Sequence, residues 1–299
     1  MPELPEVQAH AERLDREFRG RPYVGFDLLS FSSLKTVAPS PDDALGHRVG
    51  RVGRRGKHLL VEVGPVTFVV HLMQGGRLVP DTKLAAKPRN GRLRLRFGPA
   101  ESADRADVSD VELLHDPSEP LAVLLTEAGT ERRAGLWCVL TSELTITAPL
   151  DHLGPEVDAL DAEGLRGRLA ATNQRLHGAL RDQRVVAGIG RRLANEVCHR
   201  ASLSPFTLTG KLGLDTVERI RTAIAEAIAD DLTFERARDD MSSSAERPGH
   251  VHGRSGEPCP VCGDTIRSIE YRDHRIDYCA ACQTGGKVLA DNTTSRFLK

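Results

Sequence analysis

The 299-residue chain is poor in several features that would assign it to a class at once. Its formal net charge is -1, so any surface that binds nucleic acid must be a local one. No stretch reaches 18 uninterrupted apolar residues, which excludes a membrane-spanning helix. No basic-then-apolar segment opens the chain in the manner of a secretion signal. We therefore expect a cytoplasmic protein with no membrane contact.

Aromatic residues are also scarce, at 4%, but the remaining composition is that of a globular protein, with 39% hydrophobic and 28% charged residues. The length is large for a single core and suits two or three units. Six cysteines could suggest disulfides, but four of them stand in two close pairs near the C-terminus. In a reducing compartment this pattern favours a metal site.

The first half of the chain predicts one helix followed by many short strands. Residues 3–18 predict an amphipathic helix, because apolar side chains recur there at steps of three and four. From about residue 23 to 150 the pattern changes to short β-rich runs separated by Gly, Pro and charged turns. These runs include 58–63, 66–70, 93–97, 121–125 and 136–140. Regular spacing of this kind suggests a sandwich or barrel. Residues 99–119 are acidic and polar, and we expect a mobile surface loop there.

The second half becomes rich in Ala, Leu, Arg and Glu from residue 151. It predicts a small helical domain with helices near 161–171, 174–181, 190–201 and 214–230. Residues 235–250 are expected to form a flexible connector. The final block, 251–299, contains the paired cysteines and a basic tail.

The first residues of the chain offer a candidate nucleophile. Pro2 follows Met1, and a small second residue usually leaves the initiator methionine open to removal. A free α-amino group has a pKa of about 8, so a useful fraction is uncharged near neutral pH. Such an amine can attack an aldehyde-like carbon and form a Schiff base, with Glu3 beside it as a proton carrier. On its own, the segment is better explained by prolines that stiffen an ordinary terminus.

The strongest single motif is a pair of CxxC sequences, Cys259 with Cys262 and Cys279 with Cys282. The C-x2-C-x16-C-x2-C spacing is typical of a tetrahedral four-thiolate zinc site. Four thiolates leave no open coordination position, so one Zn²⁺ there would be structural. Disulfide pairing and redox chemistry are the alternatives. The other two cysteines, Cys138 and Cys198, lie in apolar surroundings and are predicted to be buried thiols.

A basic cluster covers residues 51–58, just before a predicted strand. Lys57 stands where a turn becomes a strand, so its ammonium group could reach a cleft. Without further context, a solvated charged turn explains the cluster better than catalysis does.

A pair of glycines, Gly188 and Gly190, lies between two predicted helices and is followed by Arg191. Glycines at such a place let backbone N–H groups approach an anion at a helix N-terminus. Close packing of the two helices explains the same residues equally well.

Taken together, these segments resemble the formamidopyrimidine-DNA glycosylase and endonuclease VIII family of base-excision repair enzymes, over almost the entire chain. The segments that carry the resemblance are 2–7, 55–57, 71–76, 132–137, 153–156, 186–190 and 251–254 before the cysteine pairs. The resemblance implies an α+β multidomain fold. A catalytic domain with an N-terminal helix and a two-layer β-sandwich would cover 1–150. A helix–two-turn–helix DNA-binding domain would cover 151–240 and a zinc ribbon 251–285, with a basic tail at 286–299.

The activity that the resemblance implies is bifunctional removal of oxidised bases from DNA. The Pro2 nitrogen would attack C1′ of a damaged nucleotide, and the resulting Schiff base would allow strand cleavage by β-(δ-)elimination. Glu3 would assist proton transfers, and Lys57 would contact phosphate and supply a proton. The partner would be double-stranded DNA with damaged bases or abasic sites, bound by a monomer in the bacterial cytoplasm at the nucleoid. The extruded base leaves a gap.

Residues that fill this gap depart from the family pattern. The family inserts a loop that here contains Met73 and Gln74, with Met73 one position early and Gln74 in the usual wedge position. By the resemblance, Arg132 would still contact the base opposite the lesion. The family's second wedge, a phenylalanine two residues later, is here Ala134.

Two phosphate contacts depart as well. The family usually has asparagine after Gly190, whereas this chain has Arg191. The zinc hairpin normally carries an arginine five residues before the third cysteine, and His274 stands there, with Arg275 one residue out of step. These departures keep two alternatives open. One is an abasic-site or lesion-binding protein with weak or no base excision, and the other is a glycosylase acting on single-stranded or unusual DNA.

Overall fold

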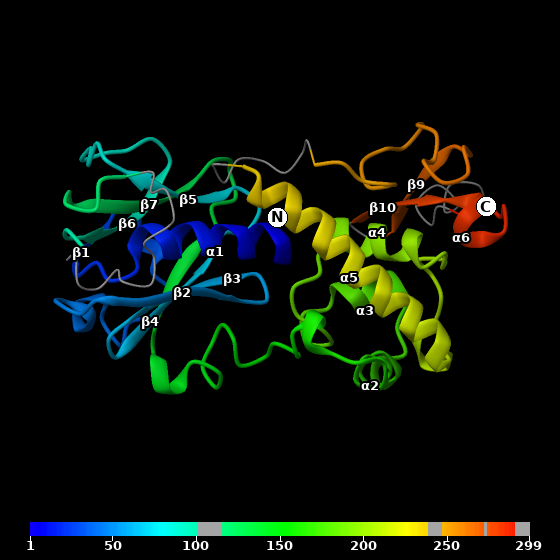
Figure 1. The fold of residues 1–299 in the computed structure, drawn as a ribbon, viewed down its shortest axis with the longest axis horizontal. Helices are drawn as coiled ribbons and strands as arrows, with labels where there is room; N and C mark the ends of the chain where they lie inside the picture. Colours follow the sequence, from blue (N-terminus) through cyan, green and yellow to red (C-terminus); the bar gives the residue numbers. More distant parts are fainter. Residues whose placement is uncertain (101–114, 239–246, 272–273, 291–299) are drawn as a thin grey trace. The chain divides into compact units, whose positions relative to one another are not determined.

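The computed structural model describes residues 1–100, 115–238, 247–271 and 274–290, and for Tyr271 and His274 it describes the backbone alone (Figure 1). The described residues form two compact units. Unit 1 comprises 1–152 together with 235–238, and unit 2 comprises 153–234 together with 247–290. The predicted loop at 99–119 and the basic tail lie largely outside these ranges, as do residues 239–246 of the connector predicted at 235–250, whose first two residues belong to a helix instead.

Unit 1 is built from one helix and two four-stranded antiparallel sheets, which confirms the predicted helix and β-sandwich (Figure 1). One sheet has the order β1 (Tyr23–Leu28), β6 (Gly91–Phe97), β7 (Leu121–Glu127) and β5 (Gly76–Asp81). The other has the order β2 (Val49–Arg55), β3 (His58–Val63), β4 (Val66–His71) and β8 (Gly135–Leu140). Short 3-10 turns lie at η1 (Phe31–Ser33), η2 (Pro41–Ala44) and η4 (Thr141–Glu143).

Helix α1 (Leu4–Phe18) follows the predicted amphipathic pattern, and its apolar side chains join both sheets in one core. The five apolar positions that predicted the helix are all buried, namely Leu4, Val7, Ala11, Leu14 and Phe18. The ring of Phe18 lies 4.9 Å from that of Phe97 in β6. Burial of such side chains stabilises each by about 1.5–3 kcal/mol, so the core fixes α1 along its whole length.

The basic segment 51–58 is organised differently from our prediction. Arg51, Arg54 and Arg55 belong to strand β2, so the cluster is mostly part of a strand. The turn contains only Gly56 and Lys57, between the paired residues Arg55 and His58.

Unit 2 contains the predicted helices and a small zinc-ribbon-like hairpin. The helices are α2 (Ala162–Thr172), α3 (Leu176–Arg181), α4 (Arg191–Arg200) and α5 (Leu214–Arg236), with the 3-10 turns η5 (Val157–Ala159) and η6 (Thr209–Lys211). Strands β9 (Ile266–Tyr271) and β10 (His274–Cys279) pair antiparallel and lead into α6 (Ala280–Thr284). Helix α5 runs beyond its predicted end at 230, and its last residues belong to unit 1.

The end of α5 is tied to α1 by polar contacts within unit 1. Arg13 donates hydrogen bonds of 2.8 Å to the carbonyl oxygens of Glu235 and Arg238. Arg236 and Glu12 form an ion pair at 2.7 Å. In the part of the chain that the structure describes, no helix is both long and apolar enough to cross a membrane.

Candidate functional site

The amino terminus is held in a fixed place by the first turn of α1. The carboxylate of Glu6 accepts a hydrogen bond of 2.9 Å from the backbone N–H of Glu3, an arrangement that closes the N-terminus of a helix. The side chain of Glu3 is only 4% exposed, and Pro2 is half-buried. The chain therefore has little freedom from Glu3 onward, whereas Met1 is exposed.

The terminal amine, which belongs to Met1 in this chain, lies in a setting that favours its uncharged form. Burial lowers its pKa below the ordinary value. The charges of Lys57 and Arg77 lower the pKa further, whereas the carboxylates of Glu3 and Glu6 oppose the shift. Glu6, Lys57 and Arg77 come from α1, the β2–β3 turn and β5, and Glu3 caps α1, so the fold brings Lys57 to the charged groups at the chain end. An amine with a depressed pKa is a better nucleophile at neutral pH.

Lys57 is buried, with 8% of its surface exposed, so the interpretation of this segment as a solvated turn was wrong. The turn before it is made by Gly56, whose φ of 56° lies in the left-handed region that favours glycine. The hairpin therefore presents Lys57 toward the protein.

Two histidines near Lys57 and the terminal amine, His58 and His71, occupy paired positions of β3 and β4. The rings of His58 and His71 lie 4.6 Å apart. Burial lowers the pKa of His58 to about 3 and that of His71 to about 4, and the charges of Lys57 and the terminal amine contribute to the second shift. Both rings are neutral at pH 7. The Nδ1 atom of His71 accepts a 3.0 Å hydrogen bond from the backbone N–H of Met73, which places its proton on Nε2. The sequence presented His71 only as part of a motif, and nothing in its pattern indicated this contact.

The loop that carries Met73 and Gln74 is a tight turn between β4 and β5. Its ends are joined by a 2.8 Å hydrogen bond from the N–H of Gly76 to the carbonyl oxygen of Leu72. A side chain at Gly75 would lie 2.7 Å from the carbonyl oxygen of Ala128, so the glycine permits close approach to the neighbouring segment. Met73 has a φ of 51° and is half-buried, whereas Gln74 is exposed. The loop thus presents Gln74 to solvent.

The segment that carries Arg132 is held by a buried ion pair between Arg92 and Glu127. Their side chains are 3% and 1% exposed, and the charged atoms lie 3.7 Å apart. The two carboxylate oxygens of Glu127 accept hydrogen bonds from the N–H groups of Arg133 and Ala134, at 3.0 and 2.9 Å. Arg92 donates to the carbonyl oxygen of Arg132 at 3.1 Å. The Arg132 side chain is exposed and that of Ala134 is fully buried, so the backbone is fixed while Arg132 faces solvent.

Replacing Glu127 by glutamine is expected to lower the free energy of unfolding by about 3 kcal/mol or more, because it leaves the Arg92 charge buried without its partner. Urea unfolding measures the effect. The matched control is Glu131→Gln, which removes an ion pair with Arg133 that is largely exposed on both sides and should cost about 1 kcal/mol or less. Equal losses in the two variants would contradict the importance of the buried pair.

In unit 2 the four predicted cysteines converge on one point. The Sγ atoms of Cys259, Cys262, Cys279 and Cys282 all lie within 4.8 Å of one another. All four are free thiols, and two of the separations are 3.9 and 3.4 Å. Four sulfurs about 2.3 Å from a central ion lie about 3.8 Å apart, so the cluster fits a tetrahedral metal centre. Cys138 and Cys198 are buried elsewhere, as predicted.

Side chains from α4 support this cluster. His199 places Nε2 3.3 Å from the Sγ of Cys259. The Glu196 carboxylate accepts hydrogen bonds from the backbone N–H groups of residues 250, 251 and 252, at 2.8 to 3.0 Å. Burial alone would raise the pKa of Glu196, but these three donors hold it below its usual value. Helix α4 thereby fixes the chain that leads into the metal centre.

The sequence left open whether His274 or Arg275 of the hairpin contacts phosphate, and the structure describes the side chain of Arg275. The Arg275 side chain is engaged locally, since its Nε donates to the Oγ of Ser268 at 2.9 Å and to the carboxylate of Asp277 at 3.0 Å. Asp277 is 2% exposed and also accepts from the N–H of Gly253. For His274 the structure gives the backbone pairing with Tyr271.

The glycine turn before α4 is braced by one side chain. Gln183 accepts from the N–H of Gly188 at 3.1 Å and donates to the carbonyl oxygen of Ile189 at 2.8 Å. Gly188 has a φ of 106°, which a residue with a side chain rarely adopts. Gly190 caps α4, and Arg191 occupies its first position with an exposed side chain.

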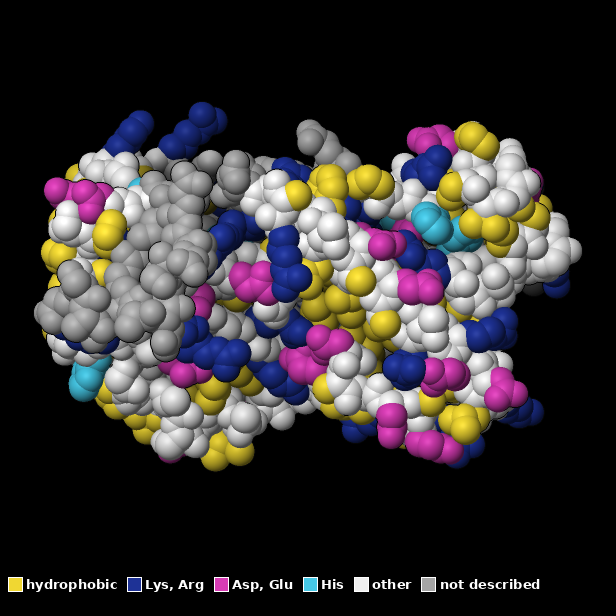
Figure 2. Space-filling view, in the orientation of Figure 1, with side chains coloured by type: hydrophobic (Ala, Val, Ile, Leu, Met, Phe, Trp, Pro, Cys, Tyr) yellow, Lys and Arg dark blue, Asp and Glu magenta, His cyan; other side chains and the backbone are white. Residues whose placement is uncertain are grey.

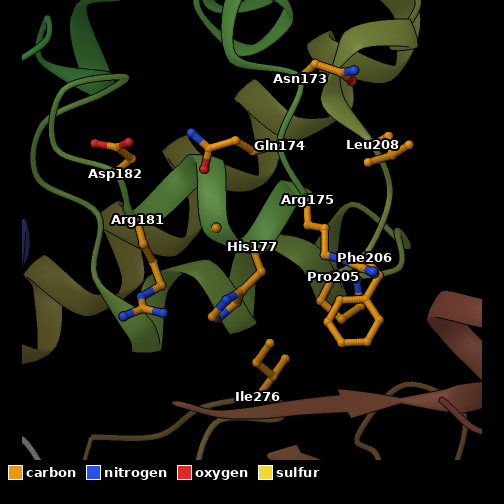
Figure 3. Close-up of a pocket in the computed structure, with 11 residues that line it drawn as sticks. Asn173, Gln174, Arg175, His177, Arg181, Asp182, Pro205, Phe206, Leu208 and Ile276 are labelled. Atoms are coloured by element: carbon orange, nitrogen blue, oxygen red, sulfur yellow. The ribbon is translucent and has the colours of Figure 1, made fainter. Parts of the chain in front are cut away.

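Unit 2 also contains a recess of about 420 Å³ (Figure 3). It is lined by residues of α3, of the segment 205–208 and of β10, including Arg175, His177, Arg181, Phe206 and Ile276. The guanidinium group of Arg175 lies 4.5 Å from the centre of the Phe206 ring. None of the predicted site residues lines this recess. On the face seen in Figure 2, acidic and basic side chains of the described residues are interspersed.

Comparison with known proteins shows which family this chain is similar to. A model of the formamidopyrimidine-DNA glycosylase N-terminal domain matches residues 1–111, and a model of the H2TH domain of the same glycosylases matches 153–240. A formamidopyrimidine-DNA glycosylase of Agrobacterium fabrum is 31% identical over 310 residues, covering 95% of this chain and all of that protein. An uncharacterized formamidopyrimidine-DNA glycosylase-like protein of Mycobacterium tuberculosis is 40% identical over 149 residues, covering 49% of this chain and 94% of the relative.

Among solved structures, the formamidopyrimidine-DNA glycosylase of Lactococcus lactis, bound non-covalently to DNA containing an abasic site, has a TM-score of 0.78. It is 20% identical, and the match covers 94% of this chain and 99% of that one. At this identity the likeness supports the fold. With the full-length relatives, it shows that the chain belongs to the formamidopyrimidine-DNA glycosylase family.

Proposed function

We propose that this protein is a bifunctional DNA glycosylase and abasic-site lyase that removes oxidised bases. The observation that carries the proposal is the partly buried amine of Met1, whose pKa is lowered and which lies among Glu3, Lys57 and Arg77. Removal of Met1 would make the secondary amine of Pro2 the chain end, one residue from the position of the Met1 amine. The relatives named as glycosylases and the neighbour bound to abasic-site DNA support the same activity.

The proposed reaction begins when the lone pair of the Pro2 nitrogen attacks C1′ of the damaged nucleotide. The bond from C1′ to the base breaks, and the base leaves with the electron pair and takes up the proton that the Pro2 nitrogen gives up. Glu3 protonates the ring oxygen as the sugar opens, which leaves an iminium between Pro2 and C1′. Loss of a proton from C2′ to Glu3 then expels the 3′ phosphate. Lys57 contacts the phosphate and supplies a proton during this elimination.

DNA would be held by the remaining predicted residues. Met73 and Gln74 would enter the gap left by the extruded base, and Arg132 would contact the base opposite. In unit 2 the Gly190 turn and Arg191 would bind phosphate at the start of α4. Since Arg275 is bonded to Asp277, we assign the phosphate contact of the hairpin to His274. We propose double-stranded DNA as the substrate and a monomer in the cytoplasm at the nucleoid as the active form.

The domain assignment and the metal are part of the same proposal. We assign catalysis to 1–150, DNA binding to 151–240 and to the ribbon at 251–285, and leave 286–299 as a basic tail. The four thiolates would hold one Zn²⁺, which prefers tetrahedral sulfur coordination. With no open coordination position, the ion would stabilise the ribbon and take no part in the reaction.

The experiment that tests the proposal is a panel of oligonucleotides carrying oxidised pyrimidines, 8-oxoguanine or an abasic site. Release of a free base and nicking of the strand are both measured, on duplex and on single-stranded DNA. Base release followed by nicking supports the proposal. Tight binding to the abasic site with no base release would favour the lesion-binding alternative, to which the buried Ala134 and the exposed Arg191 point. Faster turnover on single-stranded than on duplex DNA would favour a glycosylase that acts on single-stranded or unusual DNA.

Replacing Lys57 by alanine is expected to slow nicking of abasic-site DNA by about 100-fold, because it removes a positioned proton donor. Lys57→Arg keeps the positive charge. It should therefore retain more of the phosphate binding than of the proton donation. Nicking and borohydride trapping are compared on the same DNA. Nicking by the alanine variant at the wild-type rate would show that another group donates the proton.

A further inference from the structure

Phe31 is an aromatic side chain that lies almost wholly in solvent, at 90% exposure. No other aromatic side chain described in the structure is comparably exposed. It begins the 3-10 turn η1 and is flanked by Ser30 and Ser32. Isolated exposed apolar residues are common, so exposure alone assigns nothing. Phe31 differs from such residues in the contacts that hold its turn in place.

The turn that carries Phe31 is mounted rigidly on the core. The guanidinium group of Arg92 donates hydrogen bonds to the Oγ atoms of Ser30 and Ser32, at 2.8 and 2.9 Å. The hydroxyl of Ser33 lies 2.8 Å from the carbonyl oxygen of Arg92 and 2.6 Å from that of Ser30. Because Arg92 is itself buried against Glu127, the turn has little freedom, and an exposed ring on it is preorganised.

The same arginine holds the segment of Arg132. One Nη2 atom of Arg92 bonds to both the Ser32 hydroxyl and the carbonyl oxygen of Arg132. The next residues continue the contact, since the N–H of Lys35 donates to the carbonyl oxygen of Leu136 at 2.8 Å. The turn at 30–33 and the segment that we assign to the base opposite the lesion are therefore direct neighbours.

On its other side, the Arg132 segment meets the loop of Met73 and Gln74. The methyl group of Ala134 would lie 2.9 Å from a Cβ placed on Gly76. Three segments, 30–35, 132–136 and 72–76, thus form one continuous rim of unit 1. Along this rim the side chains of Arg132 and Gln74 are exposed and polar, Met73 is half-buried, and the large exposed apolar group is that of Phe31.

We propose that Phe31 stacks on a base of the strand opposite the lesion and so supplies the aromatic wedge that Ala134 does not. The inference rests on the proposed function, because it requires that a base is extruded from duplex DNA. Extrusion leaves unstacked bases, and an aromatic or apolar side chain inserted there replaces the lost stacking. A stacking residue needs a free ring on a fixed backbone, and Phe31 has both.

The test uses a duplex with a tetrahydrofuran abasic analogue and 2-aminopurine opposite it, so that binding is measured without cleavage. Phe31→Ala should weaken binding of this duplex by about fivefold or more, as expected for loss of one base–aromatic stack. It should also abolish most of the change in 2-aminopurine fluorescence on binding. Phe31→Trp should restore both. Since Phe31 is exposed, its replacement should leave the melting temperature unchanged.

The matched control is Ile146→Ala, which removes another exposed apolar side chain, 74% exposed, beyond the far end of β8 from Arg132. It should match the wild type in both readouts. Affinity and fluorescence of Phe31→Ala equal to those of the wild type would overturn the inference. The proposed function fails separately, if the wild-type protein gives no borohydride adduct with natural abasic-site DNA. A wild-type protein that traps DNA while Phe31→Ala behaves normally would refute the stacking role alone.

Discussion

Replacing Pro2 by glycine is expected to reduce the covalent adduct trapped by borohydride on abasic-site DNA by about 100-fold or more. The reaction needs a nucleophilic nitrogen held within bonding distance of C1′, and small misplacements of a reacting atom cost rates of this order. In the native chain, Pro2 is half-buried and the adjacent backbone N–H of Glu3 is bonded to Glu6. Glycine keeps an amine but loses the ring that restricts it.

The control for this change is Pro5→Ala, which alters the other proline of the terminus. Pro5 lies in the first turn of α1 and carries no amine that can react, so its replacement should leave trapping within about threefold of the wild-type level. Mass spectrometry of each purified chain must show that Met1 has been removed. A wild-type chain that keeps Met1 and still traps DNA would assign the nucleophile to another amine, and Lys57, whose charge acts on the terminus, would be the first candidate.

Local patterns were sufficient for the elements that depend on local chemistry. The apolar spacing of Leu4, Val7 and Phe18 predicted α1, because a helix that packs on a core needs one continuous apolar face. The CxxC pairs predicted the metal cluster, because each pair places two thiols in one tight turn and Cys259 and Cys279 then meet through the hairpin. These predictions required little knowledge of distant contacts.

The contacts that sequence could not supply are those between distant segments. Lys57 has the sequence context of a charged turn, and only the packing of the β2–β3 hairpin shows that it is buried. Arg92 and Glu127 lie 35 residues apart in different strands and meet because β6 and β7 are neighbours. Phe31 stands among serines, a hint of exposure, but its relation to Arg132 depends on the guanidinium group of Arg92. The contact of Arg275 with Asp277 is local by contrast, and strand alternation, which puts residues two apart on one face, is enough to account for it.

Changing Cys279 to serine is expected to abolish stoichiometric zinc binding and to unfold the ribbon at 251–285. Metal coordination supplies most of the folding free energy of such small modules, about 10–16 kcal/mol in isolated zinc-finger peptides. Among the described residues the apolar packing of the ribbon is small: one cluster at the metal centre comprises Val251, Cys259, Ile266 and Cys279 with Cys282 packed against it, and a second on the hairpin comprises Ile269, Ile276, Tyr278 and Ala280 with Phe206 and Leu289 packed against it. Metal content after dialysis gives the stoichiometry, and proteolysis of the folded chain reports the state of the ribbon.

The control for this variant is Cys198→Ala, because Cys198 is a buried thiol in α4 that lies outside the cluster. It should retain one zinc per chain and resist proteolysis of the ribbon. A strong chelator added to the wild-type protein should reproduce the effect of Cys279→Ser, and added zinc should reverse it. The ribbon carries His274, to which we assign a phosphate contact, so metal loss should also weaken binding to duplex DNA while leaving the Pro2 amine in place. A ribbon that stays folded without metal, with DNA affinity unchanged, would show that the thiols stabilise it by packing alone.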